Sequence, residues 1–332
     1  MADPVTAQFA EIISNMTFEK VRASVLEQIR WRVLDVLAVA LTMNINSADG
    51  EPGQQAWGAV LSDAPQVDHN ALRYLQVHPV LSALANGAML DLQPHRPQAH
   101  GGAASLDAAI IPAAWAQVEA CQGSGQLLMN ALAAGYTATE LLSGLERSNG
   151  NHEWDAGVSS GTVGAAAAVA RARNLPAPAV LNAVGFAATQ AAQLAGNATT
   201  ASRVTAGPGF YRPSRDAADL PGPGRAAMDG VLCAQMAALG ARCPNAMIDQ
   251  LQAAIGTVNC LSVMTDAWSA DTQRLAAKVK KEAIETFRKR VSAVISPSET
   301  QMFINVVQRL EHVAPGELML HLISRIRSRL DS

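Results

Sequence analysis

Hydrophobic residues recur at helical spacing along most of the chain. Between residues 18 and 43, charged residues are interspersed in the first half, and every fourth position is apolar: Val21, Val25, Ile29, Val33, Leu37 and Leu41. This spacing predicts an amphipathic helix whose second half enters an apolar core. Similar patterns predict helices over residues 80–90, 105–120, 124–146, 161–173, 177–195, 224–241, 271–293, 298–312 and 316–330.

Proline and serine positions mark the expected starts of several of these helices. We expect a first helical turn or a helix kink at each of four prolines, Pro79, Pro112, Pro176 and Pro178. Ser298, followed by Glu299, is the expected N-cap of the helix over 298–312. The alternating patterns typical of strands are nearly absent, so the sequence predicts an all-α fold.

The composition supports tightly packed helices and a partner that is not a nucleic acid. Hydrophobic residues make up 49% of the 332 residues but aromatic residues only 4%, so the apolar mass is mostly Ala, Leu and Val. A net charge of −3 with dispersed signs gives no electrostatic footprint for nucleic acid or for an anionic membrane surface. We therefore expect a small molecule or a protein as partner.

The cysteines and the apolar segments favour a cytoplasmic protein without a metal site. Cys121, Cys233, Cys243 and Cys260 lie far apart and lack zinc-ligand spacing, which is typical of core thiols in a reduced compartment. The N-terminus has no basic start followed by an apolar run, so we expect no signal peptide. The most apolar stretches, such as 33–43, are too short to cross a bilayer.

Candidate acid and base groups gather in a stretch that contains two histidines, 86-NGAMLDLQPHRPQAHGG-102. It carries Asp91, His95, Arg96 and His100 on a loop between two predicted helices. Because imidazole titrates near neutral pH, two histidines and a carboxylate could exchange a proton with a substrate. The alternative is a solvated loop whose histidines cap helix ends.

A second group of ionisable residues precedes an Ala-rich helix, in 150-GNHEWDAGVSSGTVGAAAAVA-170. His152, Trp154 and Asp155 come before Gly161, where the helical pattern begins. If the helix starts at that glycine, Asp155 is too far away to cap it, and Ser159 or Ser160 is the better N-cap. Asp155 is then either a catalytic group, with a pKa raised by burial beside Trp154, or a surface carboxylate.

The irregular segment 197–223 supplies further candidates. It is rich in Gly, Pro, Ser and Thr and contains Arg203, Tyr211 and Arg212. Arginine can hold a carboxylate through paired hydrogen bonds, and tyrosine can donate to a developing oxyanion. The segment is either a cover over a binding site or an ordinary solvated loop.

Five motifs in order resemble the MmgE/PrpD family. They are 33-VLDVLAVALT-42, 86-NGAML-90 with its histidine loop, 135-GYTATELLSGLERSNGNHEWDAGVSSGTVGAAAAVARARNLP-176, 180-VLNAVGFAATQAAQL-194 and 222-GPGRAAMDGVLCAQMAALGARCP-244. The resemblance implies a large helical domain, a smaller α/β lid, a homodimer, and metal-free and cofactor-independent proton chemistry on di- and tricarboxylates. Known members include 2-methylcitrate dehydratase, cis-aconitate decarboxylase and iminodisuccinate epimerase.

Several positions depart from the family pattern. His100 matches the family histidine of an "HP" motif, and Asp91 lies near the first acid of the family's acidic run. Asp155 and Gly222 each occupy a position where the family usually has histidine. Asp219 falls near the usual lysine.

The α/β lid is expected to be largely deleted. Too few residues separate the helical patterns on either side of 256–277 to form such a domain. We therefore expect a helical MmgE/PrpD-like domain over 1–255, a short junction over 256–277 in place of the lid, and C-terminal helices over 278–332 that pack back on the bundle.

Together these patterns favour a divergent enzyme of the lyase, isomerase or cyclase type, acting on an anionic substrate or a biosynthetic intermediate. Asp155, His100, His95, Asp91 and Tyr211 are the expected catalytic residues. The expected substrate-binding residues are Trp154, His152, Arg96, Arg203 and Arg212. Two alternatives stay open: a non-catalytic binding or assembly protein, and a conventional 2-methylcitrate dehydratase or cis-aconitate decarboxylase.

Overall fold

The computed structural model describes residues 4–42, 78–91, 103–148, 156–204, 222–244 and 271–318. Its α-helices are α1 (Pro4–Ser14), α2 (Ala23–Thr42), α4 (Pro79–Asp91), α5 (Ala103–Ala120), α6 (Gly125–Ser148), α7 (Ala156–Ala172), α8 (Ala177–Val204), α9 (Gly222–Ala238), α12 (Asp271–Val291) and α13 (Pro297–Gln308). Short 3-10 helices cover η1 (Phe18–Lys20) and η3 (Leu310–His312). No strand occurs within these ranges, which confirms the expected all-α fold.

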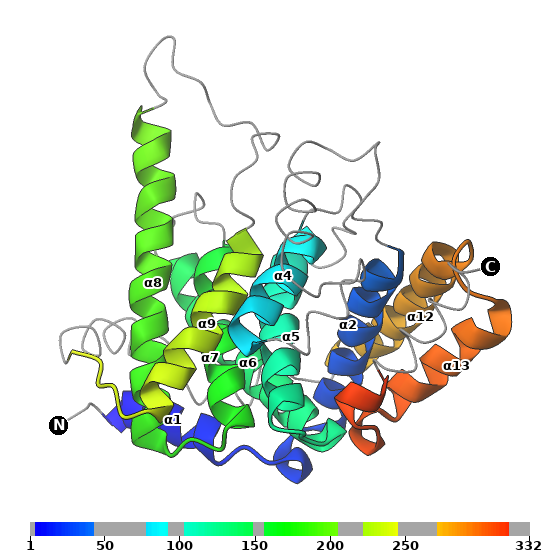
Figure 1. Cartoon of the computed structure of the whole chain (residues 1–332), viewed down its shortest axis with the longest axis horizontal. Coiled ribbons are helices and arrows are strands. Elements are labelled where there is room, and N and C mark those ends of the chain that lie inside the picture. The colour runs from blue at the N-terminus through cyan, green and yellow to red at the C-terminus, as the bar shows by residue number, and fades with distance from the viewer. Residues whose placement is uncertain are drawn as a thin grey trace.

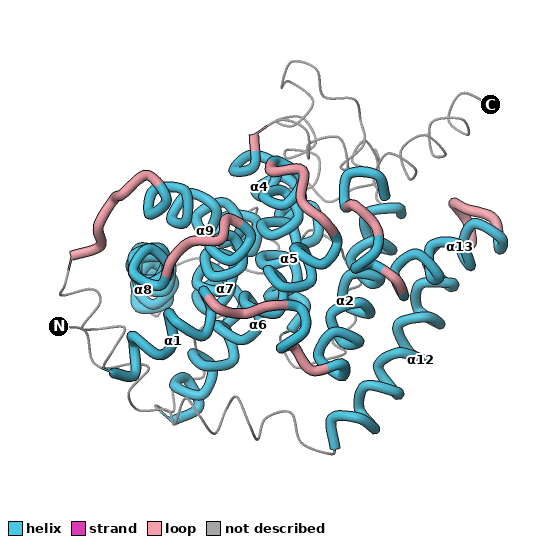
Figure 2. Tube along the Cα trace, turned by 90° about the horizontal axis from the view of Figure 1, so that it is seen from below, coloured by secondary structure: helices cyan, strands magenta, loops and turns pink. Residues whose placement is uncertain are grey.

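Helix α7 lies at the centre of the bundle. It packs against α5, α6, α8 and α9, while α4 lies on α5 and α9 (Figures 1 and 2). Every residue from Ala165 to Ala170 is buried. The small side chains let the neighbouring helices approach closely: a Cβ at Gly164 would lie 2.5 Å from Thr139 Cγ2 and 3.0 Å from Gly135 O. Gly164 therefore serves close helix packing.

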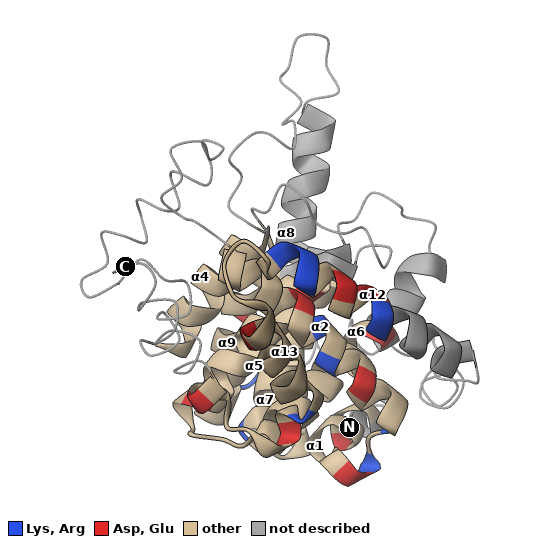
Figure 3. Cartoon of the chain, turned by 90° about the vertical axis from the view of Figure 1, so that its right-hand side faces the viewer, with Lys and Arg blue, Asp and Glu red and all other residues tan. Residues whose placement is uncertain are grey.

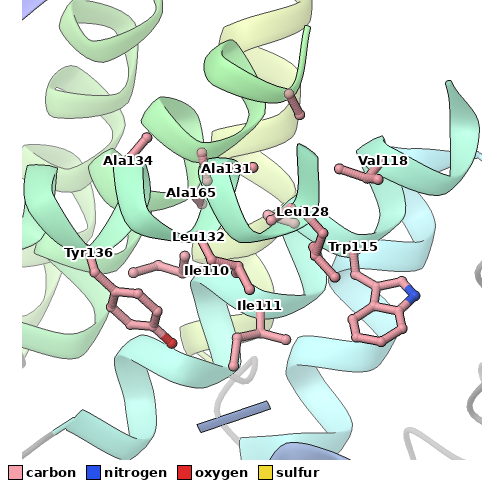
Figure 4. Packing of buried hydrophobic residues seen from close by; sticks show 14 of the residues in the cluster. Ile110, Ile111, Trp115, Val118, Leu128, Ala131, Leu132, Ala134, Tyr136 and Ala165 are labelled. Carbon is pink, nitrogen blue, oxygen red and sulfur yellow. The ribbon is translucent and has the colours of Figure 1, made fainter. Parts of the chain in front are cut away.

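Larger apolar side chains fill the space between α5 and α6. Ile110 of α5 reaches both neighbouring helices, since a Cβ at Gly135 of α6 would lie 2.7 Å from its Cγ2 and a Cβ at Gly164 of α7 would lie 2.9 Å from its Cδ1. Figure 4 shows Ile110 and Ile111 beside Leu132 of α6. Since alanine contributes little side-chain area, the branched residues of the flanking helices supply most of the burial that holds α7 in place. The core is therefore an Ala-rich centre surrounded by Ile, Leu and Val.

The C-terminal helices pack on α2, on the side of the bundle away from α8 (Figure 2). Lys280 of α12 pairs with Glu27 at 3.3 Å and lies 5.3 Å from the ring centroid of Trp31. Arg30 pairs with Glu311 of η3 at 3.0 Å. In α12 the apolar side is buried, at Phe287 and Val291, and the charged side faces solvent.

The apolar repeat predicted between residues 18 and 43 is confirmed from Val25 to Leu41. Its buried positions are Val25, Ile29, Val33, Leu37 and Leu41. The chain before Ala23 is a short 3-10 helix rather than a continuation of this helix. Helix α1, for which no helix was predicted, buries Phe9 and Ile13 in the same core.

Several predicted helix ends are wrong. Ser296, not Ser298, is the N-cap of α13: its Oγ accepts from Glu299 N at 3.4 Å, and Glu299 Oε2 accepts from Ser296 N at 2.8 Å, a reciprocal capping box. Pro112 lies inside α5, so of the two positions expected for it the first turn is excluded and the kink position is left. Helix α8 continues to Val204, so the first part of the predicted irregular segment 197–223 is helical.

Candidate functional site

The first turns of α5, α7 and α9 meet at one end of the bundle. A Cβ at Gly161 of α7 would lie 3.0 Å from Ala109 Cβ of α5 and 3.9 Å from Ala226 Cβ of α9. Each of these residues lies within the first two turns of its helix. The three helices therefore run in the same direction and begin together, and the absence of a side chain at Gly161 lets them pack closely.

Helices α4 and α8 end at this same end of the bundle. Gly224, near the start of α9, lies against Leu84 and Ala88 in the second half of α4, so these two helices are antiparallel. Figure 1 shows α8 rising toward the end at which α9 begins. The connections α4 to α5 and α8 to α9 thus start and finish at the end where the N-termini of α5, α7 and α9 meet.

Each of the three helix starts contributes a partial positive charge at this end of the bundle. The first main-chain N–H groups of a helix have no partner within it, and the aligned peptide dipoles place a partial positive charge there. Helix N-termini are accordingly common sites for carboxylates and phosphates. Because α5, α7 and α9 begin side by side, their partial charges add at one place.

Most of the predicted site residues belong to the connections at this end. Asp91 is the last residue of α4, and Arg203 lies in the last turn of α8. The others lie outside the described residues: His95, Arg96, His100, His152, Trp154, Asp155, Tyr211 and Arg212. The starts of α5, α7 and α9 and the end of α4 thus lie at one end of the bundle, whereas α8 extends well past the start of α9 (Figure 1).

The start of α7 corrects one expectation. The helix begins at Ala156 rather than at Gly161, so Ser159 and Ser160 lie inside it and are not its N-cap. Asp155 directly precedes the first helical residue in the sequence. The predicted distance between Asp155 and the helix was therefore wrong.

Helix α9 contributes an ion pair close to its start. Arg225 Nε donates to Asp229 Oδ2 at 2.8 Å, one turn along the helix. The Asp229 side chain is buried, whereas that of Arg225 is 40% exposed. Burial raises the pKa of Asp229, and the Arg225 guanidinium opposes this rise. Asp229 was not among the predicted site residues, although its spacing of four residues from Arg225 indicates the pair.

A second polar cluster fixes α5 to α2 and α6. Asp107 Oδ1 accepts from Arg32 Nη1 at 2.8 Å and from the Tyr136 hydroxyl at 2.6 Å. The Arg32 guanidinium also lies 4.9 Å from the centroid of the Tyr136 ring. Burial opposes the charge on Arg32, but the Asp107 carboxylate raises its pKa overall, and burial together with Asp107 raises the pKa of Tyr136. At neutral pH this cluster is an ion pair with a neutral tyrosine, suited to holding the start of α5 in place.

The described residues contain no further sign of a metal or membrane site. In these ranges no three His, Cys, Asp or Glu side chains are placed to hold a metal ion together. Nor does any helix of the described part have the length and apolarity needed to cross a membrane. Of the cysteines, Cys233 and Cys243 are buried, whereas Cys121 is exposed and so is not the core residue that we expected.

The described residues form an all-helical bundle in which parallel helices begin together. In the sequence, histidine, arginine and carboxylate residues occupy the adjoining connections. These features define a protein with a candidate anion site at one end of the bundle. The sequence model of the MmgE/PrpD N-terminal domain matches residues 7–262. Since this match spans well over half of the chain, the protein belongs to the MmgE/PrpD family. Comparison with curated proteins gives no match.

Proposed function

We propose that the protein is an enzyme that performs acid and base chemistry on an anionic substrate, bound where α5, α7 and α9 begin. The observation that carries this proposal is the meeting of these helix starts around Gly161. Three helix N-termini favour a carboxylate over a neutral group. The ionisable residues that the sequence offers lie in connections joined to the same helix ends.

In this proposal Asp155 is the general base. The carboxylate directly precedes Ala156, and a negative charge at the start of a helix is stabilised by the helix dipole. This effect opposes the rise in pKa that burial beside Trp154 would cause, and it favours the ionised form that can accept a proton. His100 is the partner acid, and His95, Asp91 or Tyr211 assists.

The reaction begins with removal of a proton from a carbon next to a substrate carboxylate. Asp155 accepts this proton, and protonated His100 returns one to carbon in an isomerisation or to a leaving hydroxyl, which departs as water, in a dehydration. Arg96, Arg203 and Arg212 hold the substrate carboxylate, and Trp154 and His152 line the site. The groups thus suit a lyase, an isomerase or a cyclase.

A remodelled reaction fits this chain better than conventional 2-methylcitrate dehydration or cis-aconitate decarboxylation. Gly222, the first residue of α9, stands where the family usually has histidine, so this helix start supplies no acid or base side chain there. The same substitution also favours the second candidate, a non-catalytic protein that keeps the fold for binding.

We further propose that the protein works as a cytoplasmic homodimer. The free thiols of Cys121, Cys233 and Cys243 suit a reducing compartment. We also retain the expected division into a helical domain (1–255), a junction in place of the lid (256–277) and C-terminal helices (278–332).

Proton exchange tests the enzymatic proposal. The protein would be incubated in deuterated water with 2-methylcitrate, cis-aconitate, iminodisuccinate and related di- and tricarboxylates, and the products analysed by mass spectrometry. We expect deuterium incorporation, or loss of water or carbon dioxide, that Asp155→Asn and His100→Ala abolish and that Glu317→Gln, a change at an exposed residue, leaves intact. Turnover that survives both site substitutions would show the assignment to be wrong, and binding without exchange would favour the non-catalytic candidate.

A further inference from the structure

The carboxyl group of Glu119 lies at the end of the bundle away from the candidate site. Glu119 is in the last turn of α5, and Trp115 precedes it by one turn on the same helix. Within the described part of the chain, Glu119 Oε2 is buried and accepts no hydrogen bond, and the buried Trp115 Nε1 donates none. An ionised carboxylate oxygen in this place lacks both water and a protein donor. The neutral form of the carboxyl group is therefore favoured there.

The 313–318 segment, which follows η3, lies against this carboxyl group. A Cβ at Gly316 would lie 3.7 Å from Glu119 Oε1, so the main chain of the segment approaches the end of α5. The segment includes a short helical turn, in which Leu318 N donates to Ala314 O at 3.2 Å. The Leu318 side chain is buried. A single turn of helix is thus placed over a carboxyl group that has one oxygen without a partner.

The start of α6 contacts the same stretch of chain without any charged group. A Cβ at Gly125 would overlap Leu310 O of η3 and would lie 2.5 Å from Val313 O. Helix α6 has no Asp, Glu, Lys, Arg or His before Glu140. Because the contact at Gly125 is made by main-chain atoms, it does not change with pH.

The charged groups of the neighbouring elements are engaged away from Glu119. They are Arg30 of α2, His78 before α4, Arg171 and Arg173 at the end of α7, Arg242 after α9, and Glu311, His312 and Glu317 around the segment. Arg30 pairs with Glu311 at 3.0 Å, on the side of the molecule where Figure 3 shows charged residues of both signs on α2 and α12. The two arginines of α7 donate to Met16 O at 2.6 Å and to Gln117 Oε1 at 3.4 Å. The other four groups are exposed.

The balance of effects on Glu119 favours its neutral form in the closed structure. Burial raises the pKa of Glu119 to about 7, and the Trp115 side chain opposes part of this rise. The helical turn over the carboxyl group also places a partial positive charge near it, which favours the ionised form. This effect is the weaker one, because a helix start lowers a nearby pKa by less than about one unit. Burial therefore dominates.

We propose that Glu119 is a pH-sensitive contact: its neutral carboxyl group holds the 313–318 segment on the bundle, and ionisation of this group loosens the segment. In the open state water reaches Oε2 and solvates the charge, which the closed state leaves buried without a partner. A short turn with few contacts can open in this way while the rest of the bundle stays folded. The contact lies at the opposite end of the bundle from the candidate anion site, so this inference does not depend on the proposed enzymatic function.

Hydrogen exchange of the main chain at several pH values tests the proposal. In the closed segment Val313 N donates to Leu310 O, and Glu317 N and Leu318 N donate to Ala314 O, so exchange at these positions reports opening. The rates are corrected for the intrinsic pH dependence of exchange. We then expect the opening equilibrium constant to rise about tenfold per pH unit between pH 4.5 and about pH 7 and to level off above, because the closed state holds the proton of Glu119 more tightly than the open state.

Three variants assign the pH dependence to one side chain. Glu119→Gln stays neutral at every pH and should remove the dependence, with the segment protected throughout. Glu317→Gln and His312→Gln change exposed residues of the same region and should keep the dependence of the wild type. Circular dichroism checks that the helices of each variant are intact.

Three results would overturn the proposal. One is a wild-type segment whose protection stays constant over this pH range. Another is a dependence that persists in Glu119→Gln, which would assign it to a different group. The third is a segment that exchanges as slowly as the buried centre of α7, from Ala165 to Ala170, at every pH. In that case the segment would open only when the whole bundle unfolds.

Discussion

The packing of α4 against α9 depends on the absence of a side chain at Gly224. A Cβ there would lie 2.5 Å from Ala88 N and 2.7 Å from Leu84 O, both main-chain atoms. Because main-chain atoms cannot swing aside as a flexible side chain can, α4 and α9 must separate to admit a methyl group. Such overpacking costs about 1–3 kcal/mol, and the higher helix propensity of alanine offsets up to about 1 kcal/mol. We therefore expect Gly224→Ala to lower the free energy of unfolding by about 1–2 kcal/mol.

Chemical denaturation followed by circular dichroism measures this change. The matched control is Gly316→Ala, where the nearest atom to the new Cβ is Glu119 Oε1 at 3.7 Å, an ordinary contact. This variant should be neutral or stabilised by about 0.4–1 kcal/mol, because alanine restricts the unfolded chain. A Gly224→Ala variant as stable as the wild type would show that α4 and α9 do not approach each other as closely as described here, and the reasoning about this end of the bundle would fail.

Three further changes test other parts of the structure. Asp107→Ala should lower the free energy of unfolding by about 2–4 kcal/mol in denaturation experiments, since it leaves the partly buried Arg32 without its carboxylate. Burial raises the pKa of Glu119 from 4.5 to about 7, so the folded state binds more protons than the unfolded state between these values, and its stability falls as pH rises through this window. Glu119→Gln should therefore gain stability relative to the wild type from about pH 4.5 to about pH 7. Equal pH profiles of the two proteins would contradict this. Ser296→Ala should cost about 0.5–2 kcal/mol through loss of the capping box, whereas Ser298→Ala should cost much less.

The sequence predicted the helices well where apolar residues repeat over several turns. The repeat from Val25 to Leu41 is a property of one helix and needs no knowledge of its neighbours. The start of α7 was misplaced because Ser159 and Ser160 have the composition of an N-cap but lie in a helix that already began at Ala156. For α13, Ser296 was the correct N-cap signal, because it lies three residues before Glu299, as a capping box requires. The prediction chose Ser298, which directly precedes Glu299, instead.

Long-range relations in the site could not be predicted in this way. The Arg225–Asp229 pair follows from a spacing of four residues on one helix and could have been found from the sequence. The contact of Asp107 with Arg32 and Tyr136 depends on how α2, α5 and α6 cross, which periodicity does not determine. The same holds for the meeting of three helix starts at Gly161.

Hydrogen–deuterium exchange of the main chain tests most directly whether the site lies at this end of the bundle. Exchange would be compared with and without the di- or tricarboxylate that stabilises the protein most against heat. We expect protection in the first turns of α5, α7 and α9, because the first four main-chain N–H groups of each helix have no partner within the helix and would face the bound anion. Protection confined to the opposite end of the bundle, at the C-terminal end of α5 and the N-terminal end of α8, would contradict the proposed position of the site.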